Sequence, residues 1–129
     1  MSVSVPENDL LSEKAIGLAI EVHRQLGPGL LEAAYEECLC YELRHAGIAF
    51  KRQVSVPVVY KSIRLDYTYR LDLVIENQLI VETKSVERLL PVHEAQVITY
   101  LRLTGLHVGL LLNFNTDILK NGIRRLVLK

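Results

Sequence analysis

The sequence predicts an α/β fold in which a mixed β-sheet is flanked by helices. Two stretches with helical periodicity, residues 9–26 and 30–46, come first and are followed by strand-like segments. Residues 69–84 then form a predicted hairpin, and residues 79–113 contain a strand, a helix and a second strand. Because a strand–helix–strand unit of that length usually connects parallel neighbours, the sheet is expected to contain parallel as well as antiparallel pairs.

Both early helices are predicted from apolar spacing and from glycine at their ends. In the first, Gly27 is expected to form a left-handed cap, and His23 is expected at the surface near the helix end. The second is expected to end at Gly47. Its mostly apolar stripe comprises Leu31, Tyr35, Cys38, Leu39, Glu42 and Leu43.

Residues 48–60 are predicted to form a strand with apolar alternation over part of its length. Pro57 interrupts this run, which indicates an edge strand, a bend or a short turn. Residues 64–68 are expected to be a loop or the start of a strand that leads into the hairpin.

The hairpin at residues 69–84 carries charged residues inside two apolar runs, RLDLVI and LIVETK. A three-residue loop at residues 76–78 would place Ile75 opposite Leu79, and antiparallel pairing then puts Asp72 opposite Glu82. Lys84 shares a face with Glu82 because the two are separated by one residue. A shift of one residue in the loop would place Asp72 on the opposite face from Glu82.

Two opposed carboxylates repel each other, so one interpretation of the hairpin is a site for a divalent cation. The alternative is a solvent-facing strand pair with a Glu82–Lys84 ion pair. Glu32, in the first turn of the second helix, also has two interpretations. Spacing alone favours a residue that complements the helix N-terminus, and the alternative is a third carboxylate aimed at the hairpin.

After a short polar connection, a helix is predicted from Pro91 to about Thr104, closed by Gly105. Gln96 and Tyr100 share one of its faces because they are four residues apart. The apolar run at residues 107–113 is expected to be a buried strand parallel to the one that holds Glu82, which would then be central. A short turn at residues 118–121 and an edge strand at residues 123–128 complete the predicted fold.

Composition limits the function classes without selecting one. The 129 residues are expected to form one domain, residues 1–129, with residues 1–8 as a flexible lead-in. Fifteen basic and fifteen acidic residues cancel, so net charge does not indicate nucleic-acid binding. No apolar run could span a bilayer and no signal peptide is recognised, and the two cysteines point apart on a helix, so a cytoplasmic protein with reduced thiols is expected.

The motifs in this order resemble a known family. The stretch GLLEAAY, residues 29–35, matches the pattern that names the GxxExxY proteins, a branch of the PD-(D/E)XK nuclease superfamily. The resemblance spans residues 10–128 and includes VHRQLGPG, RLDLVI, VETK, PVHEAQVITYL and LLLNFN. It implies a restriction-endonuclease-like three-layer sandwich with a mixed central sheet flanked by helices.

The resemblance also implies roles for individual residues. Asp72 matches the motif aspartate, although Leu71 stands where the motif has proline, and Glu82 and Lys84 match the (D/E)xK pair. Glu32 matches a helix acid that supports the metal site in related enzymes. Gln96 and Tyr100 match the QxxxY feature of the exonuclease-like branch, in positions to orient the lysine or a phosphate.

The function that these roles imply is hydrolysis of phosphodiester bonds in DNA, with RNA as the other candidate substrate. Mg²⁺, or Mn²⁺ in its place, would be held by Asp72, Glu82 and the backbone carbonyl of Thr83, with Glu32 in support. One alternative is a non-catalytic module that retains the fold and binds nucleic acid or protein. Another is a structural homodimer, and no membrane association is expected.

Overall fold

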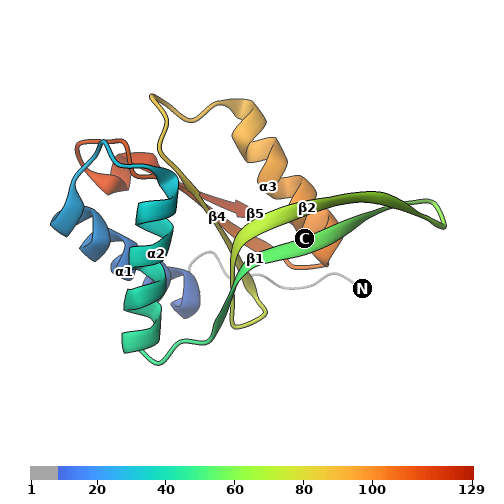
Figure 1. Ribbon diagram of the computed structural model, residues 1–129, viewed down its shortest axis with the longest axis horizontal. Coiled ribbons are helices and arrows are strands. Elements are labelled where there is room, and N and C mark those ends of the chain that lie inside the picture. The colour runs from blue at the N-terminus through green and yellow to red at the C-terminus, as the bar shows by residue number, and fades with distance from the viewer. Residues whose placement is uncertain (1–8) are drawn as a thin grey trace.

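The structure, a computed structural model, describes residues 9–129, and the predicted lead-in at residues 1–8 lies outside the described residues. Its elements follow the predicted order of two helices, strands, a helix and further strands (Figure 1). They are α1 (Leu10–Leu26), α2 (Glu32–His45), β1 (Phe50–Tyr60), β2 (Ile63–Ile75), β3 (Leu79–Lys84), α3 (Pro91–Thr104), β4 (Val108–Asn113), the 3₁₀ turn η1 (Leu119–Gly122) and β5 (Ile123–Val127).

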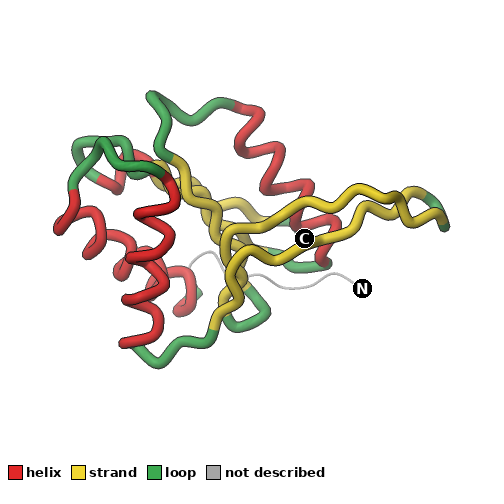
Figure 2. The backbone as a smooth tube through the Cα atoms, in the orientation of Figure 1, coloured by secondary structure: helices red, strands yellow, loops and turns green. Residues whose placement is uncertain are grey.

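The five strands form one mixed sheet in the order β1-β2-β3-β4-β5. Strands β3 and β4 are parallel and the other neighbours are antiparallel, so the predicted mixed sheet and the crossover through α3 are confirmed. β3 is central, as predicted, and β1 and β5 are the edges. Helices α1 and α2 cover one face and α3 covers the other, which makes three layers with β3 in the middle one (Figure 2).

The α1–α2 layer forms the larger core. Asp9 caps α1 by accepting a hydrogen bond from the Ser12 amide at 2.7 Å. Tyr35 of α2 is fully buried and stacks on Phe114, with ring centroids 4.4 Å apart. Gly27 has a positive φ of 67°, but its ψ of −174° is extended, so it is not the left-handed cap that was predicted.

Two predictions about this layer are wrong. Leu31 is 81% exposed, because α2 begins only at Glu32 and Leu31 is its extended N-cap residue, outside the buried stripe. His23 is buried, and its Nε2 lies 2.8 Å from the carbonyl oxygen of Thr116, so it is not a surface residue. That hydrogen bond joins the end of α1 to the loop after β4.

The strands β1 and β2 differ from prediction mainly in length. Of the two alternatives for residues 64–68, a loop or the start of a strand, the structure has the strand, because they belong to the continuous strand β2. The β1–β2 pairing runs from Phe50↔Ile75 to Tyr60↔Ile63 and changes register between Pro57 and Val59, so Pro57 marks an irregularity on an edge strand. Among residues 9–129, no helix has the length and apolar character that crossing a bilayer requires.

Helix α3 packs closely on the sheet. It has the predicted bounds, with Pro91 at its first turn and Gly105 in the left-handed conformation at its end. Gly109 of β4 allows the close approach, because a Cβ there would lie 2.6 Å from Cγ1 of Val97. This packing holds α3 against β4, its main neighbour in the sheet.

Candidate functional site

The site lies where β2 separates from β3. Their backbone pairing runs from Ile75↔Leu79 to Leu73↔Val81, which confirms the predicted three-residue loop and the register. The pairing does not extend to Asp72, the next residue along β2. Beyond this point β2 continues with β1 alone, so Asp72 and Glu82 stand at a fork in the sheet.

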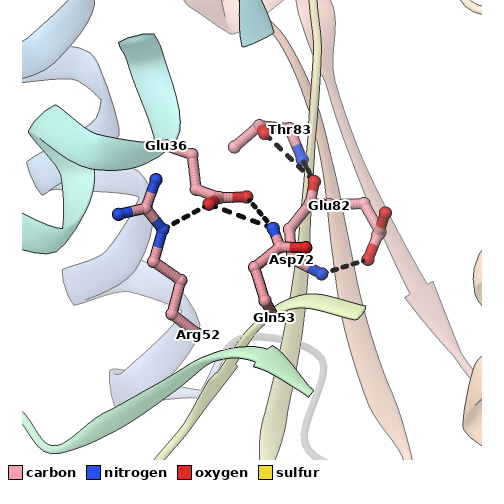
Figure 3. A network of polar contacts seen from close by, with 6 residues as sticks. All are labelled: Glu36, Arg52, Gln53, Asp72, Glu82 and Thr83. Carbon is pink, nitrogen blue, oxygen red and sulfur yellow. Dashed lines mark hydrogen bonds and ion pairs between the residues drawn. The ribbon is translucent and has the colours of Figure 1, made fainter. Parts of the chain in front are cut away.

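Side chains replace the backbone ladder at the fork. The amide of Asp72 donates to Oε1 of Glu82 at 2.9 Å. In return, Oδ2 of Asp72 accepts from the amide of Thr83 at 2.9 Å and from its Oγ1 at 3.1 Å (Figure 3). Each acid is therefore held by the backbone of the opposite strand, and both are kept at the fork.

Glu82 has an unusual electrostatic environment. It is 6% exposed, and burial, followed by the nearby charge of Asp72, raises its pKa to about 8. The hydrogen bond from the Asp72 amide and the charge of Lys84 lower the pKa, but they do not compensate. A pKa of about 8 favours the protonated form of Glu82 at neutral pH, and additional positive charge at the fork would favour its ionised form.

Lys84 is the last residue of β3 and is half-buried. It pairs with Asn113 of β4, and alternation along the strand puts it on the same face as Glu82. Its charge acts on Glu82, as described above. The structure therefore keeps the acid–x–lysine pair on one face.

Helix α3 brings Tyr100 towards the acids. Tyr100 is buried, and its pKa is raised by burial and then by the charges of Glu82 and Asp72. Its ring lies 6.0 Å from that of Tyr69 on β2. A cavity of about 240 Å³ opens between β2 and α3, and its lining comprises Tyr69, Val92, Ala95, Gln96, Thr99 and Tyr100. Gln96 and Tyr100 thus share a pocket, and Tyr100 adjoins the acids.

Glu32 is placed differently. It is exposed at the start of α2, and its Oε1 accepts a long hydrogen bond, 3.4 Å, from the amide of Ser85, one residue beyond Lys84. Within residues 9–129, no group of three or more His, Cys, Asp and Glu side chains could hold a metal ion. The structure therefore leaves Glu32 outside a cluster with Asp72 and Glu82, and its place in the first turn suits the helix dipole.

The sequence reasoning missed Glu36. This residue of α2 is 4% exposed, forms an ion pair with Arg52, and accepts from the Gln53 amide group at 2.8 and 3.1 Å. Gln53 has a left-handed φ of 54° and lies between the β1 residues that pair with Leu73 and Leu71, the two neighbours of Asp72. Figure 3 shows the Glu36 cluster on the α2 side of β3 and the Glu82 carboxylate on the other side.

A sequence signal for Glu36 does exist. It occurs with Leu39, Cys40 and Leu43 at the spacing of one helix face, and all of these residues are buried. A carboxylate in such a position needs a partner, which Arg52 and Gln53 provide. Glu36 therefore fixes the strained segment of β1 that lies beside Asp72.

The donor chemistry of the fork suits a hard divalent cation. Asp72 Oδ1 and Glu82 Oε2 accept no hydrogen bond from any part of residues 9–129, so each carboxylate keeps one oxygen for a ligand. Mg²⁺ retains several waters and needs only one or two carboxylates. The two carboxylates and the adjacent Thr83 carbonyl could supply oxygen ligands to such an ion, and its charge would favour the ionised form of Glu82, whose pKa is raised. Among residues 9–129 the acids form a pair and not a cluster of three or more ligands, so water would complete the coordination.

Comparison with known protein families gives a match over most of the chain. The family model described as the PD-(D/E)XK nuclease superfamily matches residues 9–126, which is nearly the whole chain. No curated protein and no solved structure shows significant similarity to the chain. The mixed five-stranded sheet between helices is consistent with the restriction-endonuclease-like fold of that superfamily.

Proposed function

The chain belongs to the PD-(D/E)XK nuclease superfamily, and from that premise we propose that it is a metal-dependent nuclease that hydrolyses phosphodiester bonds in DNA, with RNA as a second candidate substrate. The observation that carries the proposal is the fork, where Asp72 and Glu82 are fixed next to each other with one free oxygen each. We further assign the chain to the GxxExxY branch, on the GLLEAAY motif at residues 29–35.

In this proposal Asp72, Glu82 and the Thr83 carbonyl hold Mg²⁺, or Mn²⁺ in its place. The ion, when bound, supplies an activated water and positive charge that offsets the charge developing on the phosphate. The chain contributes the placement of the acids through the bonds across the fork. It also contributes burial, which strengthens electrostatic interactions at Glu82 because water is largely excluded there.

Four further residues have proposed roles around this centre. Lys84, on the face of Glu82, offsets negative charge in the transition state or orients the attacking water. Tyr100 and Gln96, from the pocket beside the acids, hydrogen-bond a phosphate oxygen or position the lysine. Glu32 reaches the centre only through water or a second ion, because the structure keeps it apart from the other acids.

Cleavage assays test the proposal directly. Purified protein is incubated with labelled single-stranded DNA, duplex DNA and RNA in Mg²⁺, in Mn²⁺ and in EDTA. We expect metal-dependent cleavage that falls at least about 100-fold in Asp72→Asn and in Lys84→Ala, because each removes part of the charge stabilisation. Glu87→Gln, at an exposed position after β3, is the matched control and should cleave normally. Circular dichroism verifies folding, and full activity in either site variant would refute the assignment.

A non-catalytic nucleic-acid- or protein-binding module is the second candidate. The observation that favours it is that the described residues form a carboxylate pair and no group of three or more ligands. Calorimetry with Mn²⁺ separates the two functions. Binding at millimolar concentrations that is lost in Asp72→Asn supports the nuclease. DNA affinity that falls with salt and is unchanged in Asp72→Asn, with no metal binding, supports the module.

A further inference from the structure

The strands β1 and β2 extend well beyond the sheet. β2 pairs with β3 only at residues 73–75, whereas its pairing with β1 continues to Tyr60↔Ile63. Residues 54–71 therefore form a two-stranded arm, which Figure 1 and Figure 2 show projecting past α3. The arm enters the sheet at Asp72, so one continuous strand connects its tip to the fork.

One face of the arm is aromatic and exposed. Ile63, Tyr67 and Tyr69 share a face because they alternate along β2, and Tyr60 pairs with Ile63. Their exposed fractions are 60% for Ile63, 71% for Tyr67, 46% for Tyr69 and 60% for Tyr60. A row of large exposed side chains of this kind is uncommon on a protein surface unless it binds something. The row ends at Tyr69, whose ring contacts Tyr100 beside the fork.

Charge is distributed unevenly in this neutral chain. The arm, residues 54–71, contains three basic residues, Lys61, Arg64 and Arg70, and one acid, Asp66. The helical layer, residues 9–45, contains seven acidic and three basic residues. At the tip, the Nζ of Lys61 lies 5.4 Å from the ring centroid of Tyr60, so a cation and an aromatic surface occur together. The arm therefore suits a polyanion with flat apolar groups.

We infer that the aromatic face of the arm binds single-stranded nucleic acid and leads it to the pocket between Tyr69 and Tyr100, next to the fork. Tyrosine rings stack on unpaired bases of any sequence. Lys61, which lies over the Tyr60 ring, is placed to attract a phosphate beside the stacked bases, and Arg64 and Arg70, on the other face of the arm by alternation, add positive charge at longer range. Bases inside a duplex are already stacked, so this face selects single strands or unpaired ends. From residue 63 to residue 71 the strand rises about 26 Å, which is enough for several nucleotides.

This inference deepens the proposed nuclease function and rests on it for the fate of the bound strand, but binding is measurable without cleavage. Fluorescence anisotropy in EDTA, with a labelled oligothymidylate of about 16 nucleotides as probe, gives the affinity of the intact protein; this length is about the upper end of the site sizes of single-strand-binding domains. We expect Tyr67→Ala to weaken binding about ten-fold and Tyr67→Phe to retain it, because the phenyl ring still stacks. Tyr41→Ala removes a comparably exposed tyrosine, 54%, from α2 and should bind normally.

The charge contribution has its own measurement. Lys61→Ala should reduce the slope of log affinity against log salt by about 0.7, the value for one phosphate contact on a single strand, because Lys61 lies over the Tyr60 ring. A duplex of the same length should compete poorly with the oligothymidylate. Equal affinity of wild type and Tyr67→Ala, or stronger binding of the duplex, would overturn the inference.

Two further outcomes are distinguished by the same proteins. If sedimentation shows a dimer that becomes monomeric in Tyr67→Ala while oligothymidylate affinity is unchanged, the arm is a contact between two copies and the inference is overturned. If binding depends on Tyr67 but no substrate is cleaved in Mg²⁺ or Mn²⁺, the arm inference stands and the proposed nuclease function fails. If the wild type cleaves nucleic acid but binds no oligothymidylate, the proposed nuclease function stands and the arm inference is overturned.

Discussion

Replacing Glu82 with glutamine should remove a pH dependence from the stability of the fold. The folded protein holds this carboxyl with a pKa of about 8, against 4.5 for an ordinary glutamate. Between these values the folded state keeps a proton that the unfolded state has released. The stability that Glu82 contributes is therefore fully present below about pH 4.5 and is lost as the pH rises towards 8.

The size of the effect follows from the two pKa values. Each unit of difference corresponds to about 1.4 kcal/mol, so the difference between 4.5 and about 8 amounts to roughly 4–5 kcal/mol at high pH. Most of this loss, roughly 3–4 kcal/mol, falls between pH 5 and pH 8. The glutamine in Glu82→Gln cannot ionise, and its amide oxygen can still accept from the Asp72 amide, so the variant should lack this loss.

Urea unfolding of wild type and Glu82→Gln at several pH values from 5 to 9, in EDTA, measures the difference. We expect the variant to be the more stable protein at pH 8, with the two stabilities converging towards pH 5. Glu87→Gln, at an exposed glutamate, should follow the wild type throughout. Parallel curves for wild type and Glu82→Gln would show that burial and Asp72 do not raise the pKa of Glu82, and would refute the electrostatic account of the fork.

Three further predictions concern packing and reactivity. Glu36→Gln should lower the free energy of unfolding by about 1–3 kcal/mol in urea titrations, because the guanidinium that it pairs with loses its counter-charge. Gly109→Ala should lower the free energy of unfolding by about 1–3 kcal/mol, because its Cβ would lie 2.6 Å from a side-chain carbon of α3. Gly17→Ala, in open space on α1, is the control and should raise the free energy of unfolding by about 0.5–1 kcal/mol. Thermal unfolding of the two variants measures the difference. In thiol titration of the native protein, half-buried Cys38 should react first and Cys40 slowly, because burial raises the pKa of the Cys40 thiol; a fast phase that persists in Cys38→Ala would contradict this.

The fold could be predicted wherever local chemistry determines it. The polar residues 76–78 predicted the hairpin loop, and Pro91 and Gly105 predicted the two ends of α3; the structure confirms both. Residues 64–68 were open to two interpretations, a loop or the start of a strand, because most residues on both faces of the projecting arm are exposed and alternation there carries no apolar signal. His23 was misplaced because its partner, the Thr116 carbonyl, is 93 residues away in the chain.

In the candidate site, too, the features that local sequence determines could be predicted and those that depend on distant packing could not. Asp72 and Glu82 could be paired from the sequence because one short loop connects them, and the register of that loop was confirmed. The roles of Asp72, Glu82, Lys84, Gln96 and Tyr100 remain predictions. Glu36 was missed because its importance depends on how α2 packs against β1, which no local pattern specifies. Glu32 lies in the first turn of α2, as its spacing indicated, and its supporting role at the metal centre remains a prediction.

The continuity of β2 has a geometric consequence. Tyr67 and Asp72 are five residues apart on one strand, so the backbone rise separates them by about 16 Å. No linker or flexible joint intervenes, and the interval is as constant as the strand itself. A base stacked on Tyr67 would therefore lie at a set spacing from the fork, and the length of bound strand between the two would not vary.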